Sequence, residues 1–320
     1  EPCAGKGVFL DALKSNGFKN ISAVEYDSTF AEDLKKRFKG IQVTQSDFLD
    51  TAATEKFDLI IGNPPYVQWN NIEPAIRSKL AQEKFWEAYS NGEWDLLYAF
   101  IIWSVEKLKE DGELIFIVPY NWFNSTHART LRNYLINNGY FDIILHFGEL
   151  KLFADCFPNN IIFKYVKKPD LKTRPKIRVL DFNEKKANVE NLLAVINTFL
   201  KNSAIAEKMK FFEMHNFSSP DMWFLGDEKD VSFLTSIEKA ATIRGASNYT
   251  KLSDHFYVSV GMVSGFDKAF LVENEELKNF STDELKYVLD FVKAKNCARF
   301  SISGSSKYVF LDRIKSLDEL

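Results

Sequence analysis

The residues with the clearest chemical potential are Asn63-Pro64-Pro65-Tyr66, which directly follow a short apolar run that ends at Gly62. The run predicts a buried strand that stops abruptly. Because prolines fix φ and donate no backbone N–H, the Asn63 side-chain oxygen and the Pro64 carbonyl remain available as acceptors. With the flat ring of Tyr66, the set suits a planar amino group held by its two N–H bonds. As a simple strand-ending turn, the same residues would carry no chemistry.

A second group lies within the first 25 residues. Gly5 and Gly7 precede a helical pattern, and they let a ligand approach the backbone where the helix N-terminus favours a carboxylate. A short strand over residues 21–24 then leads to Glu25, 20 positions after Gly5. An acid at that distance, at the tip of the next strand, grips a ribose diol in doubly wound folds. A lone Gly-x-Gly is common at strand-to-helix turns, so the case for a ligand-binding loop depends on its spacing to Glu25.

These two groups resemble the motifs of a known family. The segment from Glu1 to Gly7 together with Glu25 resembles motifs I and II of γ-class DNA methyltransferases that act on adenine N6, although Lys6 and Cys3 depart from the usual pattern. The stretch Asn63–Tyr66 resembles motif IV. The resemblance implies S-adenosylmethionine as the cofactor. It assigns cofactor binding to Glu1, Pro2, Cys3, Gly5, Gly7, Glu25, Asp47, Phe48 and Asn63, and catalysis to Asn63, Pro64, Pro65, Tyr66 and Phe153.

Two of those assignments rest on further motifs. Asp47-Phe48 resembles motif III, which implies that the acid binds the adenine amino group of the cofactor and that the ring packs on the adenine. An Asp in a strand-end turn before a core Phe is the alternative interpretation. The segment 148–163 resembles motif VIII, a loop that supplies a second ring against the target base. Phe153 is the first choice for that ring and Phe157 the second, but the chain has 29 Phe and a core role competes for both.

The elements that would position these residues alternate along the chain. Helical patterns are predicted over 28–38, 94–108 and 127–136, and buried strands over 114–119 and 141–147. This order predicts an α/β fold, a doubly wound, mostly parallel, Rossmann-like sheet with helices on both faces. The central strand of such a sheet would precede Glu1, so we expect further residues upstream.

The domain boundaries follow from changes in pattern. Residues 1–168 are expected to form the methyltransferase domain without its first strand, and residues 169–250 a linker and helical segment. Residues 251–320 resemble the start of a β-containing target-recognition domain, which we expect to be incomplete. A β-rich accessory domain with ordinary surface lysines is the alternative.

Composition narrows the function classes. The chain has 320 residues, 46% of them apolar, and a net charge of −3, so any nucleic-acid surface must be a local patch. Three scattered cysteines form neither a disulfide framework nor a metal-ligand cluster. We therefore expect no metal and a reducing, cytoplasmic location. No apolar run approaches membrane-spanning length, so no membrane partner is expected.

The resemblance implies a site-specific DNA adenine methyltransferase of a restriction-modification system. Its partner would be double-stranded DNA, with a nuclease domain or subunit attached in some members. Three alternatives remain: methylation of a glutamine amide in release factors, guanine N2 methylation of ribosomal RNA, and a catalytically idle DNA-binding specificity component. Release-factor enzymes lack a large C-terminal domain. An idle component has no need of Asn63, Tyr66, Glu25 and Asp47 together.

Overall fold

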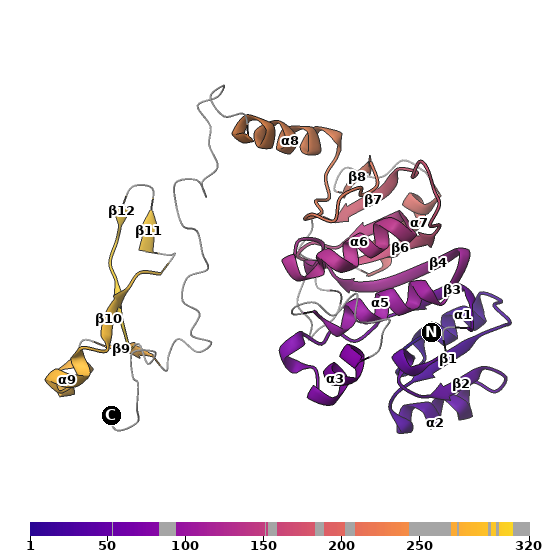
Figure 1. Cartoon of the computed structure of the whole chain (residues 1–320), viewed down its shortest axis with the longest axis horizontal. Helices are drawn as coiled ribbons and strands as arrows, with labels where there is room; N and C mark the ends of the chain where they lie inside the picture. Colours follow the sequence, from indigo (N-terminus) through magenta and orange to yellow (C-terminus); the bar gives the residue numbers. More distant parts are fainter. Residues whose placement is uncertain are drawn as a thin grey trace. The chain divides into compact units, whose positions relative to one another are not determined.

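The computed structural model describes residues 1–52, 54–82, 94–150, 152, 159–182, 189–201, 209–242, 270–273, 275–293, 296–298 and 301–309. The chain divides into two compact units, Glu1–Lys239 and Ala240–Leu320 (Figure 1). None of the helices in the described ranges has the length and apolar character needed to span a lipid bilayer.

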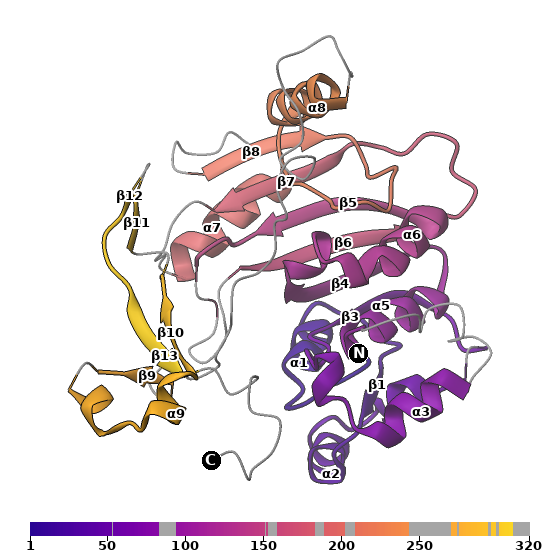
Figure 2. The same ribbon diagram turned by 60° about the vertical axis from the view of Figure 1, so that its left-hand side comes forward.

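A six-stranded sheet forms the centre of the first unit, in the order β3-β4-β6-β5-β7-β8, which can be followed in Figure 2. A separate parallel pair, β1 and β2, accompanies it. The strands are β1 (Ser22–Glu25), β2 (Gln42–Gln45), β3 (Phe57–Gly62), β4 (Leu108–Pro119), β5 (Gly139–His146), β6 (Asn160–Lys167), β7 (Ile177–Phe182) and β8 (Met209–Met214). The helices of this part are α1 (Val8–Ser15), α2 (Ser28–Arg37), α3 (Pro74–Gln82), α5 (Leu96–Glu106), α6 (Arg129–Asn138), α7 (Val189–Leu200) and α8 (Glu228–Thr242).

Helices cover both faces of the sheet, as the alternation of strand and helix predicts. In β5, Ile144 belongs to one apolar cluster while its neighbours Ile143 and Leu145 belong to another. Successive side chains of a strand point to opposite faces, so the two clusters lie on opposite sides of the sheet. The first cluster includes residues of α5 and α6, and the second includes Phe199 of α7. The α/β class is therefore confirmed.

In the six-stranded sheet, β3, β4, β5 and β7 run in one direction, and β6 and β8 run in the other. β3 and β4 are parallel, as are β5 and β7, but β6 is antiparallel to both β4 and β5. A parallel neighbour needs a crossover connection, whereas β6 follows β5 without a described helix between them. β8 likewise pairs antiparallel with β7. The prediction of a mostly parallel sheet is therefore confirmed, with β6 and β8 as the two reversed strands.

The longest strand begins earlier than predicted. Asp111 and Gly112 follow the predicted helix 94–108 and precede the predicted strand 114–119. In the structure they lie inside β4, where Asp111 has a φ of 59°. Opposite it, the pairing with β3 shifts register between Phe57 and Leu59. Asp is one of the few residues that tolerates the left-handed region, so the turn is absorbed as an irregularity of the strand.

The first strands carry a small core of their own. Leu10 of α1, Leu34 of α2 and Ala23 of β1 pack together with Ala4 and Phe38. The side chain of Asp27 starts α2, since its Oδ1 accepts from the backbone N–H groups of the second and third residues of the helix at 2.8 and 3.0 Å. This small core fixes the loop that precedes α1 against the end of β1.

Residues 169–239 also belong to the first unit. β7 and β8 extend the large sheet within the range that the sequence analysis assigns to a linker and helical segment. The start of the target-recognition segment, 251–269, lies outside the described residues. The described part of the second unit has a three-stranded sheet in the order β10-β13-β9 and a short pair, β11-β12. Its elements are β9 (Leu271–Val272), α9 (Thr282–Leu285), β10 (Val288–Phe291), β11 (Cys297–Ala298), β12 (Ser301–Ile302) and β13 (Ser306–Val309).

Candidate active site

The four residues Asn63–Tyr66, here called the proline corner, follow the carboxyl end of β3, which pairs with β4. Asn63 is exposed, Pro64 is buried, and the Tyr66 ring is 38% exposed. The Tyr66 hydroxyl lies against two acceptors, the Asn63 Oδ1 atom and the carbonyl of Ile117 in β4, the latter at 2.6 Å. The single hydroxyl proton is shared between these two acceptors, and the oxygen of the Asn63 amide, rather than its nitrogen, lies toward Tyr66.

The first residues of the chain touch this corner. The Cys3 thiol donates to the backbone carbonyl of Asn63 over 3.3 Å. Burial raises the pKa of Cys3 to about 12, so the sulfur keeps its proton and acts as a donor. Pro2 packs over the end of β3, since a Cβ placed on Gly62 would lie 3.3 Å from its Cδ. The loop and the corner, 60 positions apart in sequence, therefore meet at one edge of the sheet.

The two glycines of the loop differ. Gly7 has a φ of 76°, and a Cβ there would come within 2.6 Å of Leu34 and 2.7 Å of Phe38. Its small size is required by packing against α2. Gly5 has a φ of 49°, and a Cβ there would meet nothing within 4 Å. Gly5 thus leaves open space beside the backbone, which is what close approach by a ligand needs.

Glu25 ends β1 and is only 8% exposed. One carboxylate oxygen accepts from the Gly5 amide at 2.6 Å and the other from the Asp27 amide at 2.8 Å. Each carboxylate oxygen has a second lone pair, so the group retains acceptor capacity. Tyr26, which the sequence analysis did not single out, is 74% exposed at the same strand tip. Its signal is its position directly after the acid.

Asp47 and Phe48 have the geometry of the alternative interpretation, an Asp in a strand-end turn followed by a core Phe. The Asp47 Oδ1 atom accepts from the Leu49 amide at 2.9 Å and caps the 3₁₀ turn Phe48–Asp50. Phe48 is buried, and its ring centroid lies 5.5 Å from that of Phe100 in the core. Their assignment to the cofactor site stays a prediction.

Comparison with known proteins bears on the family. Residues 8–153, which include Glu25 and the whole proline corner but neither glycine of the loop, match the Eco57I restriction-modification methylase family. This match agrees with the resemblance drawn from the motifs.

Similar proteins extend the match to nearly the whole chain. The chain is 32% identical over 97% of its length to the type II methyltransferase M.HindII of Haemophilus influenzae, and 31% identical over 96% to M.HincII of Haemophilus influenzae. It spans 57% and 55% of those two proteins, a little more than half of each. Among solved structures, the type IIG restriction endonuclease BpuSI aligns with a TM-score of 0.50 and 22% identity, over 67% of this chain and 27% of that one. This likeness supports the α/β fold.

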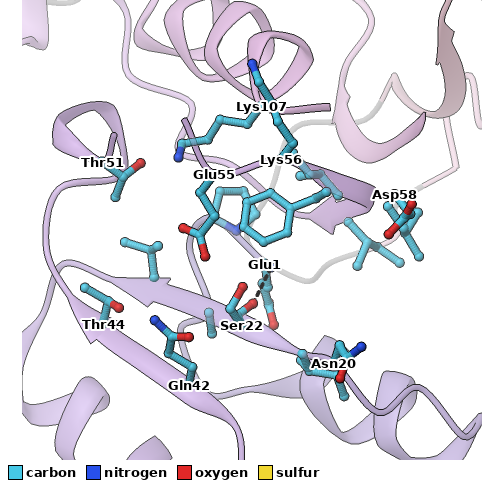
Figure 3. A pocket seen from close by; sticks show the side chains of 18 of the residues that line it. Glu1, Asn20, Ser22, Gln42, Thr44, Thr51, Glu55, Lys56, Asp58 and Lys107 are labelled. Carbon is cyan, nitrogen blue, oxygen red and sulfur yellow. Dashed lines mark hydrogen bonds between the residues drawn. The ribbon is translucent and has the colours of Figure 1, made fainter. Parts of the chain in front are cut away.

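A pocket of about 1040 Å³ lies between the β1–β2 pair and β3 (Figure 3). Of the predicted site residues, Glu1, Pro2 and Phe48 line it. The Glu1 Oε2 atom is buried and has no hydrogen-bond partner among the described residues. Its burial raises the pKa of the Glu1 carboxyl to about 8. This carboxyl is therefore largely protonated at neutral pH, and a cationic ligand group beside it would favour its charged form.

The remaining predicted ring is not placed. Phe153 and its alternative Phe157 lie outside the described residues. The loop that carries them leads into Asn159, which is described, and there a polar cluster appears that the sequence analysis missed. His146 lies between Asp181 and Asn159, with hydrogen bonds to both. All three stand at or next to strand ends on one edge of the sheet. That position marks each of them as a candidate but does not show which of them meet.

Proposed function

We propose that this chain performs the methyl transfer of a site-specific DNA adenine methyltransferase in a restriction-modification system. The observation that carries the proposal is the contact between the glycine loop and the Asn63–Tyr66 corner. This contact brings the oxygens of Asn63 and Pro64 and the exposed Tyr66 ring next to the loop. In that loop, the Gly5 amide donates a hydrogen bond to the Glu25 carboxylate. Transfer of a methyl group from a cofactor to a planar amine needs both parts: a loop that binds the cofactor and a corner that binds the amine.

The loop residues fit S-adenosylmethionine. Gly5 offers open space, and Glu25 retains lone pairs for a ribose diol. The unpartnered Glu1 oxygen suits the cationic amino group of the cofactor's methionine part. Bound there, the cofactor would supply an electrophilic methyl group. Cys3, Pro2 and Asp47 would complete its surroundings, whereas Gly7 contributes by letting α1 and α2 pack closely.

The corner residues would make the target amine reactive. The lone pair of adenine N6 is delocalised into the ring, so the nitrogen is a poor nucleophile. Hydrogen bonds from its two N–H groups to the Asn63 Oδ1 atom and the Pro64 carbonyl favour tetrahedral geometry and free that lone pair. Such preorganised acceptors, together with alignment of the reacting atoms, supply the rate without a strong base.

An adenine inside a duplex is out of reach, so the base must be flipped out of the helix. The exposed face of Tyr66 would replace part of the lost stacking, worth roughly 1–3 kcal/mol per base. Phe153 is proposed as the second ring. The partner is double-stranded DNA, and the fusion named in the type II restriction enzyme and methyltransferase RM.Eco57I of Escherichia coli, 31% identical over 31% of this chain, motivates a nuclease domain or subunit as a further partner.

The test is transfer of tritium from labelled S-adenosylmethionine to DNA, to ribosomal RNA and to a release factor. We expect label in DNA alone, and digestion to nucleosides should recover it as N6-methyl-2′-deoxyadenosine. The Asn63→Ala variant should lose the activity, whereas Asn197→Ala, on the exposed side of α7, should keep it. Label in protein or RNA but not in DNA would defeat the proposal.

A further inference from the structure

His146 ends β5 and joins two neighbouring strands. Its Nδ1 atom lies 2.9 Å from the Asp181 Oδ1 atom of β7, the residue opposite it in the parallel register. Its Nε2 atom lies 2.8 Å from the Oδ1 atom of Asn159, which directly precedes β6. The Tyr120 ring, just past the end of β4, packs on the imidazole with centroids 4.8 Å apart. One ring thus connects the carboxyl ends of β4, β5 and β7 with the start of β6.

Both ring nitrogens face acceptors, which defines the protonation state of this arrangement. A carboxylate only accepts, so Nδ1 carries a proton, and an amide oxygen opposite Nε2 requires a second proton there. Burial disfavours the charged ring, but the hydrogen bonds to Asp181 and Asn159 and the charge of Asp181 outweigh it. The pKa of His146 is therefore raised above its ordinary value. Asp181 and Tyr120 are the titratable groups that the described residues place against the ring.

Asn159 is the residue that this arrangement holds. Its φ is 74°, in the left-handed region that Asn tolerates better than most residues. Its carbonyl accepts from the Tyr120 amide at 2.9 Å. The next carbonyl, of Asn160, accepts from the Phe147 amide at 2.9 Å. The turn into β6 is therefore tied to the ends of β4 and β5 at three points, and His146 supplies the side-chain tie.

The same edge carries the proline corner. Tyr66 lies against Ile117 of β4, and Tyr120 follows three residues later. Resting on the proposed function, we propose that the imidazolium form of His146 is a positioning residue for base binding: it holds Asn159, and with it the start of β6, at the edge where Asn63 and Tyr66 receive the base. When His146 loses its Nε2 proton, the Asn159 oxygen loses its donor, and a bond to the ring remains only where the amide turns its Nδ2–H group toward Nε2.

The sign of the pH effect follows from the raised pKa. The hydrogen bond from Nε2 to the Asn159 oxygen is fully formed below the ordinary pKa of a histidine. It is lost as pH rises through the pKa of His146 in the folded protein. We expect the amide protection of Tyr120 and Phe147, measured by hydrogen exchange on the full chain and corrected for intrinsic exchange, to fall across that range. A loss of about tenfold is the size expected for one charge-assisted hydrogen bond.

The experiment compares wild type with His146→Gln, Asn159→Asp and the control His215→Gln, whose ring is 81% exposed. His146→Gln should show the low protection at every pH, and Asn159→Asp, which stabilises the charged ring, should move the transition to higher pH. Single-turnover methylation of DNA should follow the same profiles, while the Kd for S-adenosylmethionine stays unchanged. The proposal is overturned if His146→Gln, folded by its thermal transition, keeps wild-type protection and its pH transition, or if Asn159→Asp leaves the transition in place. Hydrogen exchange is measured without DNA, so its result does not depend on the proposed function. If the wild-type chain does not methylate DNA, that result contradicts the proposed function and leaves the positioning role of His146 to be judged by exchange.

Discussion

Replacement of Tyr66 by Ala tests the stacking role of the proline corner. Tyr66 is 38% exposed, so part of its surface is accessible to a base. Stacking of a base on an aromatic ring contributes roughly 1–3 kcal/mol, which corresponds to a factor of about 5 to 150 in the flipping equilibrium. We expect Tyr66→Ala to lower the single-turnover methylation rate within that range and to leave the Kd for S-adenosylmethionine unchanged.

The assay reports flipping separately from chemistry. DNA with 2-aminopurine at the target adenine gains fluorescence when that base leaves the stack, and methyl transfer is followed with enzyme in excess. Phe233→Ala, at a 64% exposed aromatic on α8, is the matched control and should leave both signals unchanged. If Tyr66→Ala gives wild-type fluorescence and a wild-type rate, the ring does not stack on the base and the reasoning fails.

Three other changes test the fold around the site. Gly7→Ala should cost about 2 kcal/mol or more in the free energy of unfolding, measured by urea denaturation, because of its positive φ and the 2.6 Å approach to Leu34. Since burial raises the pKa of Cys3 to about 12, iodoacetamide at pH 8 should label the exposed Cys297 long before Cys3, as read by mass spectrometry; equal rates would contradict this. Arg132→Met should lower the free energy of unfolding by roughly 3 kcal/mol, because the buried guanidinium donates to three backbone carbonyls; a change in urea midpoint near zero would refute it.

The parts of the site that could be predicted from sequence are local ones. The stop at Gly62 and the turn that follows need only an apolar run and two prolines, and the structure places that turn at the end of β3. Glu25 was predicted at a strand tip from its spacing to Gly5, and there its carboxylate accepts from the Gly5 amide. In each case the residues that decide the conformation are neighbours in the chain.

The parts that sequence did not supply depend on distant partners. Gly5 and Gly7 look alike in sequence, and only the approach of α2 shows that one is needed for packing. The reversal of β6 depends on which strand it joins, and its own apolar pattern carries no direction. His146 was overlooked because Asn159 and Asp181 lie 13 and 35 positions away. A lone histidine at the end of a strand gives no sign of either partner.

The contact between Tyr66 and Asn63 links stacking to hydrogen bonding at the corner. An amide oxygen has two lone pairs, so one bond from the Tyr66 hydroxyl leaves one site for the amino group of a base. The hydroxyl also turns the Asn63 nitrogen away, which prevents two N–H groups from facing each other when the base enters. Tyr66→Phe separates these roles, because it keeps the ring and removes the hydroxyl. It should preserve 2-aminopurine fluorescence and slow methyl transfer by about 2- to 10-fold, the effect of one neutral hydrogen bond. Equal losses in fluorescence and rate would show instead that the hydroxyl acts only by holding the ring in place.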